Sequence, residues 1–244
     1  MALAFLTTTA SEPLTSATSI TSVGIDTTGA NLIVVGMVCA GTASDAATPV
    51  TDSKANAWTR IGTSAVNGGN RISLFYSVPT TVGTGHTVTY TIQSSTGLSI
   101  GVSCASGAAA SPLDAGSNST FAVNAAAQTL TTSPSVTLSQ ANELLVACAW
   151  NAAGGKVGTL AAGVGGATWT VDFDLENGAG QAFTFGHSIV SSTGPHSTTF
   201  SINGGVNSFL SVGMCSFKEL AAIAASDITL PLDRRGGWAS GWRR

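Results

Sequence analysis

The sequence contains few charged residues. Only 9% of its 244 residues are Asp, Glu, Lys or Arg, whereas 43% are hydrophobic, and the formal net charge is −3. Because this balance creates no basic field, the composition argues against nucleic acid as the main ligand. Small and hydroxyl-bearing side chains are left to cover much of the surface, and such a surface permits close contact with neighbouring molecules.

Long hydrophobic runs are also missing. The apolar run 1–6 has no Lys or Arg before it and ends at Thr7, so it is too short and wrongly flanked for a signal peptide or a membrane span. The other apolar stretches have the length of strands. We therefore expect a protein of cytoplasmic origin with no membrane partner.

Cysteine is scarce, and its spacing matches no metal site. The four residues lie inside apolar, strand-like runs without a CxxC motif or a Cys/His cluster; they are Cys39, Cys104, Cys148 and Cys215. Free cysteine is among the most buried residue types, so we expect four buried thiols. A disulfide between sheets or between chains is the alternative.

Catalytic patterns are equally sparse. His86 and His196 precede similar segments, which favours a shared role in a turn over catalysis, and the chain has no nucleophile elbow or phosphate-binding loop. Asp172, Asp174 and Glu176 alternate along one segment, where they could hold Ca²⁺, although a solvated strand end is the favoured interpretation. The sequence therefore predicts no catalytic, cofactor-binding or metal-binding residues, and the protein is not expected to be an enzyme.

The chain does contain an internal repetition. Four segments return about 110 residues later in the same order. The pairs are 30–36 with 141–147, 57–59 with 168–170, 86–92 with 196–202, and 98–101 with 210–213. Because a nearly constant offset over four segments is hard to obtain by chance, we predict that residues 30–107 and 141–217 are two copies of one β unit.

Strand-like segments recur about every ten residues between clusters of Gly, Asn, Asp and Ser, which is typical of sandwiches and jelly rolls. The predicted strands are 2–8, 19–23, 32–39, 57–61, 71–78, 87–92, 98–103, 135–138, 144–150, 168–173, 182–189, 197–202 and 209–217. Two of them, 32–39 and 144–150, are almost wholly apolar, so they are expected to be central and covered on both faces.

These strands predict an all-β, jelly-roll-like sandwich of two sheets, built from the duplicated unit, with extended amino- and carboxyl-terminal arms. Each copy supplies too few strands to bury both of its faces alone, so we expect the two copies to face one another in one body. Two tandem sandwiches are the alternative. Residues 108–133 are expected to be a polar linker between the copies.

The carboxyl-terminal segment has a different composition. Residues 1–219 are predicted to form the body, and residues 220–244 are predicted to form an extended docking arm. Four of the nine basic residues and two of the five Trp lie in the last twelve positions. Trp and Arg supply typical anchor contacts at interfaces. The expected contact residues are Arg234, Arg235, Trp238, Trp242, Arg243 and Arg244. Packing on its own domain and Arg contacts to nucleic acid inside a particle are the alternatives.

Four motifs carry a resemblance to a known family. They are Val-Thr-Asp-Ser-Lys-Ala-Asn-Ala-Trp-Thr at 50–59, Arg-Ile-Ser-Leu-Phe-Tyr-Ser at 71–77, Ser-Gly-Ala-Ala-Ala-Ser-Pro-Leu-Asp at 106–114, and Ala-Asn-Glu-Leu-Leu-Val at 141–146. Over residues 30–217 the chain resembles a poorly characterised family of bacterial and phage β-sandwich proteins. Ala55 stands where this family usually has Gly, and Cys104-Ala105 stands where it often has an acidic and an aromatic residue.

The resemblance implies a structural virion protein of a bacteriophage, such as a head decoration, minor capsid or tail-associated subunit. It would be made in the cytoplasm of the bacterial host and reside in the virion. Its expected partners are other copies of itself and other virion proteins such as the major capsid protein, which the amino-terminal strand and the arm would contact. No catalytic residues come with this resemblance, and nucleic acid is not an expected partner.

A carbohydrate-binding surface module is the alternative function. In that case Trp58, Trp150 or Trp169 would stack on sugar rings, and exposed aromatic side chains would lie beside Asp or Asn in the same loop. Trp58 and Trp169 occupy equivalent positions of the repeat, so we first interpret them as paired core residues, since large aromatics dominate sandwich cores.

Overall fold

The computed structural model of the chain describes residues 2–14, 17–40, 45–67, 70–93, 97–114, 129–132, 135–151, 157–176, 182–202 and 210–221. The regular elements among these residues are β-strands, which confirms the expected all-β fold. Many of the strands are rich in Val, Ile and Thr, whose branched side chains pack well on a pleated surface. No helix in the described ranges is long and apolar enough to cross a membrane.

The first half of the chain forms two antiparallel sheets. The larger sheet has the order β1 (Ala4–Leu14), β8 (Gly97–Ser106), β3 (Leu32–Ala40), β6 (Asn70–Ser77) and β5 (Thr59–Asn67). The smaller sheet has the order β2 (Ser19–Thr21), β7 (Val88–Ile92) and β4 (Asp45–Asp52). As described, β4 and β5 are therefore edge strands of two different sheets, and they follow one another along the chain.

The second half has the same strand orders. Its larger sheet runs β9 (Ala108–Leu113), β18 (Leu210–Glu219), β12 (Glu143–Asn151), β15 (Ala182–Val190) and β14 (Thr170–Glu176). Its smaller sheet runs β10 (Thr129–Thr131), β17 (Thr198–Ile202) and β13 (Val157–Ala162), and a short pair joins β11 (Val136–Leu138) to β16 (Gly194–His196). If β1 is matched with β9 and β3 with β12, the orders agree strand for strand.

Individual hydrogen bonds repeat as well. The hydroxyl oxygens of Thr21 and Thr89 are 2.9 Å apart between β2 and β7, and those of Thr131 and Thr199 are 2.8 Å apart between β10 and β17. Cross-strand threonine pairs of this kind stabilise a sheet modestly. The two halves thus share pairing and side-chain contacts as well as strand order.

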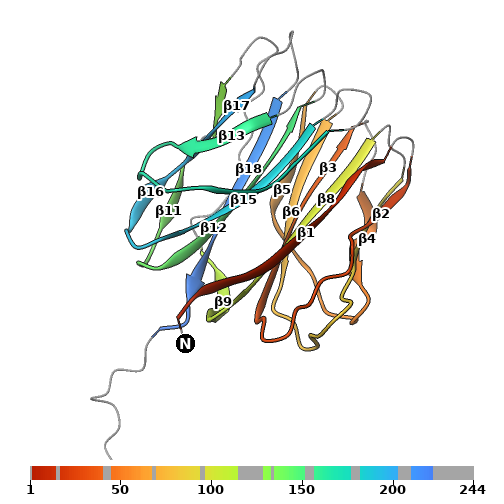
Figure 1. Cartoon of the computed structure of the whole chain (residues 1–244), viewed down its shortest axis with the longest axis horizontal. Helices are drawn as coiled ribbons and strands as arrows, with labels where there is room; N and C mark the ends of the chain where they lie inside the picture. Colours follow the sequence, from red (N-terminus) through yellow and green to blue (C-terminus); the bar gives the residue numbers. More distant parts are fainter. Residues whose placement is uncertain are drawn as a thin grey trace, which may run out of the picture.

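The sheets form four layers (Figure 1). The two larger sheets pack against each other, and the smaller sheets cover their outer faces. Val34 and Val146 lie in the central core, whereas the next residues, Val35 and Ala147, lie in the outer cores. This alternation confirms that 32–39 and 144–150 are central strands covered on both faces. The expected facing sheets are present, and each also carries a smaller outer sheet.

Two glycines of the first half receive aromatic rings of the second. Gly36 and Gly101 are directly opposite each other on β3 and β8. A Cβ atom would lie 2.7 Å from the Phe185 ring if added at Gly36 and 2.9 Å from it if added at Gly101. Phe183 and Phe185 are fully buried with their ring centroids 6.2 Å apart. The larger sheets therefore interlock through rings that fit over backbone without side chains.

Several sequence expectations were wrong. The amino-terminal segment is not an arm, because β1 is an edge strand whose Thr8 and Thr9 pair with Ser103 and Val102 of β8. Residues 108–133 are not only a linker, since they contribute β9 and β10; residues 115–128 lie outside the described part. Residues 45–52, which are absent from the predicted strands, form β4, and Pro49 lies there because an edge strand tolerates a missing N–H group.

The register of the repeat also needs a correction. The sequence echo aligned Leu32 with Glu143, but Leu32 shares the central core with Leu144. Because side chains alternate across a strand, a shift by one residue would place the whole apolar set on the wrong face. The burial pattern therefore sets the correspondence of β3 and β12 one residue later than sequence identity suggested.

Candidate functional site

The predicted interaction arm begins at the corner where the chain also starts. The six contact residues, Arg234, Arg235, Trp238, Trp242, Arg243 and Arg244, lie outside the described residues. The N–H of Leu220 donates to the Gly107 carbonyl at 2.7 Å, and the N–H of Leu3 donates to Glu219 Oε1 at 2.9 Å. The end of β18 is therefore held beside the start of β1, near the N mark in Figure 1.

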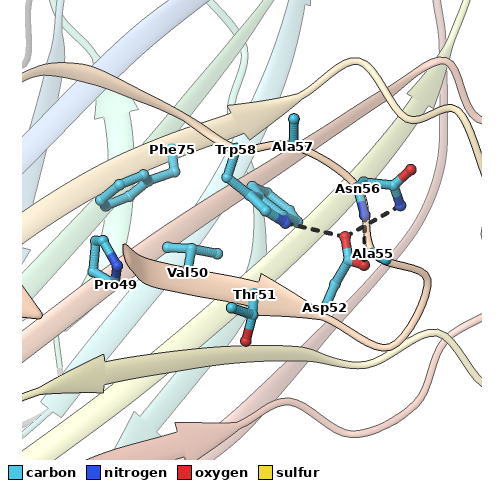
Figure 2. A pocket seen from close by; sticks show the side chains of 9 residues that line it. All are labelled: Pro49, Val50, Thr51, Asp52, Ala55, Asn56, Ala57, Trp58 and Phe75. Atoms are coloured by element: carbon cyan, nitrogen blue, oxygen red, sulfur yellow. Dashed lines mark hydrogen bonds between the residues drawn. The ribbon is translucent and has the colours of Figure 1, made fainter. Parts of the chain in front are cut away.

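An aromatic cavity opens at the edge of the first half. Its volume is about 530 Å³, within the usual range of small-ligand sites. The lining comes from β4, the 53–58 connection and β6, and consists of Pro49, Val50, Thr51, Asp52, Ala55, Asn56, Ala57, Trp58 and Phe75. In Figure 2 the Val50 side chain points toward Trp58 and Phe75, whereas Thr51 points to the opposite face of β4.

Asp52 organises the polar end of this cavity. Its Oδ1 accepts the backbone N–H groups of Lys54 and Asn56 at 2.9 and 3.1 Å, and its Oδ2 accepts the indole N–H of Trp58 at 3.0 Å. Burial acts to raise the pKa of Asp52, but the hydrogen bonds from Asn56 and Lys54 outweigh it and hold this pKa below its usual value. The carboxylate therefore fixes the position of the Trp58 ring.

The loop between β4 and β5 has a geometry that only some residues tolerate. Ala55 has φ of 59°, in the left-handed region that favours glycine. The next residue, Asn56, accepts the N–H groups of Thr80 and Thr81 with its Oδ1 and donates from Nδ2 to Asp52 and to the Thr81 carbonyl. The turn is thus locked to a second loop, and the glycine of the resembled pattern falls at its strained position.

Two polar side chains of the cavity, Asp52 and Asn56, are already hydrogen-bonded within the protein. Both carboxylate oxygens of Asp52 and both amide atoms of Asn56 already have partners. His86 Nε2 lies 3.3 Å from Asp52 Oδ2, and the Nδ1 of this buried ring lies 3.0 Å from the Thr27 hydroxyl. The apolar part of the lining comes from Pro49, Val50, Ala57 and Trp58, with the Phe75 ring largely buried behind them.

The second half does not repeat this arrangement. Ala162 takes the place of Asp52, because it pairs with Thr198 of β17 as Asp52 pairs with Val88 of β7. Gly186 takes the place of Phe75, and the Leu160 side chain occupies the space where a Cβ atom at Gly186 would lie. The same framework therefore packs without the carboxylate and the aromatic ring that border the Trp58 cavity.

Among the buried polar atoms of the second half that lack hydrogen-bond partners, two bear on this comparison. They are Nε1 of Trp169 and Nδ1 of His196, the residues equivalent to Trp58 and His86. Burial lowers the pKa of His196 and so favours its neutral ring, and the Ser192 hydroxyl lies 3.3 Å from its other nitrogen. The missing carboxylate at Ala162 accounts for the unpaired indole.

The acidic segment 172–176 lies on the edge strand β14 and is only partly solvated. Asp172 Oδ1 is 2.9 Å from His187 Nδ1, and Asp174 accepts the Thr184 hydroxyl. Phe5 of β1 stacks on His187 with centroids 3.7 Å apart. The described residues contain no group of three His, Cys, Asp or Glu side chains able to hold a metal ion.

A second group of perturbed acids is closed to ligands. Glu143 and Asp114 are 0% and 2% exposed. Burial and the neighbouring carboxyl group of Asp114 raise the pKa of Glu143 to about 7. Neither residue lines the Trp58 cavity or the smaller one beside Gly165. This pair therefore affects the free energy of unfolding and is not placed to contact a substrate.

The four cysteines are free and buried, as expected. Burial raises the pKa of Cys104 to about 12 and also raises the pKa of Cys148 and of Cys215. Since the thiolate is the nucleophile, these groups are inert in the folded protein.

The three tryptophans considered for sugar stacking have different environments. Trp150 is 0% exposed in the central core, so it cannot stack on a ligand. Trp58 and Trp169 are partly buried against the two outer cores, which agrees with their interpretation as paired residues. Only Trp58 lines a described cavity.

Comparison with family models, with curated proteins and with solved structures gave no match. The resemblance to phage β-sandwich proteins therefore stays a prediction.

Sequence reasoning selected Trp58 but did not predict its cavity. Pro49 and Phe75 come from strands separated from it in sequence, so only the fold brings them together. A signal for Asp52 was present, because an Asp followed by Asn four residues later and Trp six residues later suits a carboxylate that caps its own turn.

Proposed function

We propose that this protein is a structural subunit of a bacteriophage particle, either a capsid decoration or minor capsid protein or a tail-associated subunit. It assembles through its carboxyl-terminal arm with copies of itself and with other virion proteins such as the major capsid protein. The proposal assigns no catalysis to the chain.

The observation that supports this proposal is the composition of residues 220–244 together with the place where the described chain ends. The apolar clusters of the described residues run from Leu3 to Phe217, and β18 ends at a corner that is already held by β1 and Gly107. The arm continues from this corner with a sequence rich in Arg and Trp, the residue types that supply anchor contacts at interfaces.

The distribution of charge between the body and the arm also supports assembly. Residues 1–219 contain ten acidic and five basic residues, a net charge of −5, whereas 220–244 contain two acidic and four basic residues, a net charge of +2. Opposite net charges accelerate encounter between the arm of one copy and the body of another.

Carbohydrate binding is the second candidate, and the Trp58 cavity is the observation that favours it. An aromatic ring lies there beside Asp52 and Asn56, as expected for a lectin. Both polar side chains are engaged within the protein, however, so few groups remain to recognise sugar hydroxyls. We therefore rank this candidate second.

Assembly can be tested by light scattering after size exclusion and by mixing with particles that lack the protein. The full chain is compared with a chain ending at Ala221 and with a full chain carrying Arg→Gln at 234, 235, 243 and 244. We expect the full chain alone to assemble or to bind particles, while circular dichroism shows the same strand content in all three. Equal binding by all three, or a monomer that ignores the particles, would refute the proposal.

A further inference from the structure

We infer that the Trp58 cavity receives a tryptophan side chain, Trp238 or Trp242, from the arm of a second copy of the chain. This inference rests on the proposed assembly through the arm and adds the place where the arm binds. The occupant is a protein side chain, and a sugar is an outcome that the experiment must separate from it.

The walls of the cavity suit an aromatic side chain. Val50 and Phe75 form rigid walls that are only 6% and 3% exposed, and the Trp58 ring is held in place by its hydrogen bond to Asp52. Aromatic rings gain from offset or edge-to-face packing in addition to the area that they bury. The positions of these walls are fixed before binding, which lowers the entropic cost of association.

The chemistry of the wall disfavours a strongly polar ligand. Asp52 and Asn56 have no amide or carboxylate atom without a partner, and Thr51 points to the other face of β4. A ligand with many hydroxyl groups would exchange its hydrogen bonds to water for apolar contacts. An indole needs a partner for one N–H only.

The fold itself does not require an aromatic wall at this place. At the position equivalent to Phe75 the second half has Gly186, and the Leu160 side chain lies where a Cβ atom at Gly186 would be. Since the same strand order forms without an aromatic residue there, the Phe75 wall is a feature of one half and not a consequence of the architecture.

The arm has the length and composition needed to reach this site. Trp238 and Trp242 lie 17 and 21 residues beyond Ala221, which corresponds to at most about 60 and 75 Å of extended chain. Gly236, Gly237 and Gly241 precede them and allow the backbone to approach a surface closely. The cavity is also lined by β4, an edge strand of its sheet, and an extended segment can add to a sheet at such an edge.

Steering and anchoring are then separate steps. The basic arm is attracted by the net negative charge of the other copy's body. At the cavity itself the guanidinium group of Arg60 lies 5.0 Å from the centroid of Phe75, and Lys54 belongs to the adjoining turn, so the arginines of the arm do not bind there. The tryptophan ring therefore supplies the affinity at this point.

The test uses the full chain and a blocked cavity. Ala57 is exposed at the rim, so Ala57→Tyr fills the opening without entering a core; Thr168→Tyr places the same side chain at the equivalent exposed position of the second half. Self-association is measured by sedimentation velocity over a range of concentrations. We expect wild type and Thr168→Tyr to associate alike, and Ala57→Tyr and the double variant Trp238→Ala/Trp242→Ala to associate at least about tenfold more weakly.

A peptide of residues 226–244 gives an independent measurement. Titrated into the Trp238→Ala/Trp242→Ala chain, it should bind, whereas a peptide with both tryptophans replaced by alanine, or a chain that also carries Ala57→Tyr, should not. Isothermal titration calorimetry reports both comparisons, and thermal melting shows whether Ala57→Tyr remains folded.

The possible failures are distinguishable. If Ala57→Tyr associates like wild type while the double tryptophan variant does not, the arm binds elsewhere; the cavity inference is then wrong and the proposed assembly stands. If the chain is monomeric at every concentration and ignores particles, both are wrong. Binding of an oligosaccharide that Ala57→Tyr abolishes, without any effect on association, would overturn the inference in favour of a glycan.

Discussion

Adding one methyl group at Gly36 tests whether the two halves form a single interlocked body. In Gly36→Ala the new Cβ atom would lie 2.7 and 2.9 Å from two atoms of the Phe185 ring and 3.1 Å from Cβ of Cys148. The ring cannot retreat easily, because it is fully buried and also lies against Gly101. Overpacking of this kind costs about 1–3 kcal/mol.

A second contribution to the free energy of unfolding of Gly36→Ala has the opposite sign. Replacing Gly by Ala restricts the unfolded chain and stabilises the native state by about 0.4–1 kcal/mol where the backbone conformation allows it. We therefore expect Gly36→Ala to lower the free energy of unfolding by about 0.5–2 kcal/mol. Gly24→Ala is the control, because its Cβ atom would lie 3.5 Å from the nearest atom, an ordinary contact; that variant should be unchanged or slightly more stable.

Urea unfolding followed by circular dichroism measures both variants. Phe185→Leu should be less destabilising in the Gly36→Ala background than in wild type, because the smaller side chain leaves room for the methyl group. If Gly36→Ala is as stable as Gly24→Ala, the rings of the second half do not pack on the first, and the two halves would have to be treated as separate sandwiches.

Three further predictions concern buried groups. Because the pKa of Glu143 in the folded protein is raised to about 7, its neutral form contributes stability below the pKa of the unfolded chain, and this contribution is lost as pH rises through the folded pKa. Urea unfolding should therefore show Glu143→Gln gaining stability relative to wild type between pH 5 and 8, by up to about 3 kcal/mol. A difference that stays constant with pH would contradict the raised pKa. Ala162→Asp should give the Trp169 indole N–H an acceptor and stabilise the folded chain by about 1–2 kcal/mol at pH 7. Ala161→Asp, on the neighbouring exposed position, is the control and should give no such gain; equal melting temperatures of the two variants would contradict the prediction. The four buried cysteines should react with a thiol reagent only at the rate of unfolding, and a fast phase in native buffer would show that one of them is accessible.

Local patterns were enough to place the most apolar and the most regularly alternating strands. The runs that became β3 and β12 could only be central, and alternating Val88, Tyr90 and Ile92 gave β7 its buried face. Strand β9, Ala-Ala-Ala-Ser-Pro-Leu, was missed because its small side chains carry no alternation and its place follows from pairing with β18.

The candidate site was less accessible to sequence reasoning. The Asp52 turn had a local signature, but nothing in the sequence around Phe75 indicates that its ring borders a cavity while the equivalent Gly186 does not. Contacts between residues on different strands depend on packing across the sandwich, which periodicity along one strand does not encode. For the same reason the apolar pattern of β1 does not indicate whether this strand pairs within its own chain or with a sheet of another copy.

The pairing of β18 determines how the body responds to mechanical load. This strand leads directly into the arm, and it pairs with β12 without interruption over nine residues, from Leu210 with Asn151 to Lys218 with Glu143. A pull on the arm along the strand axis therefore loads this ladder in shear, so that many backbone hydrogen bonds must break together and not one after another. In the assembly that we propose, force applied through a docked arm would therefore enter the subunit along this continuous ladder.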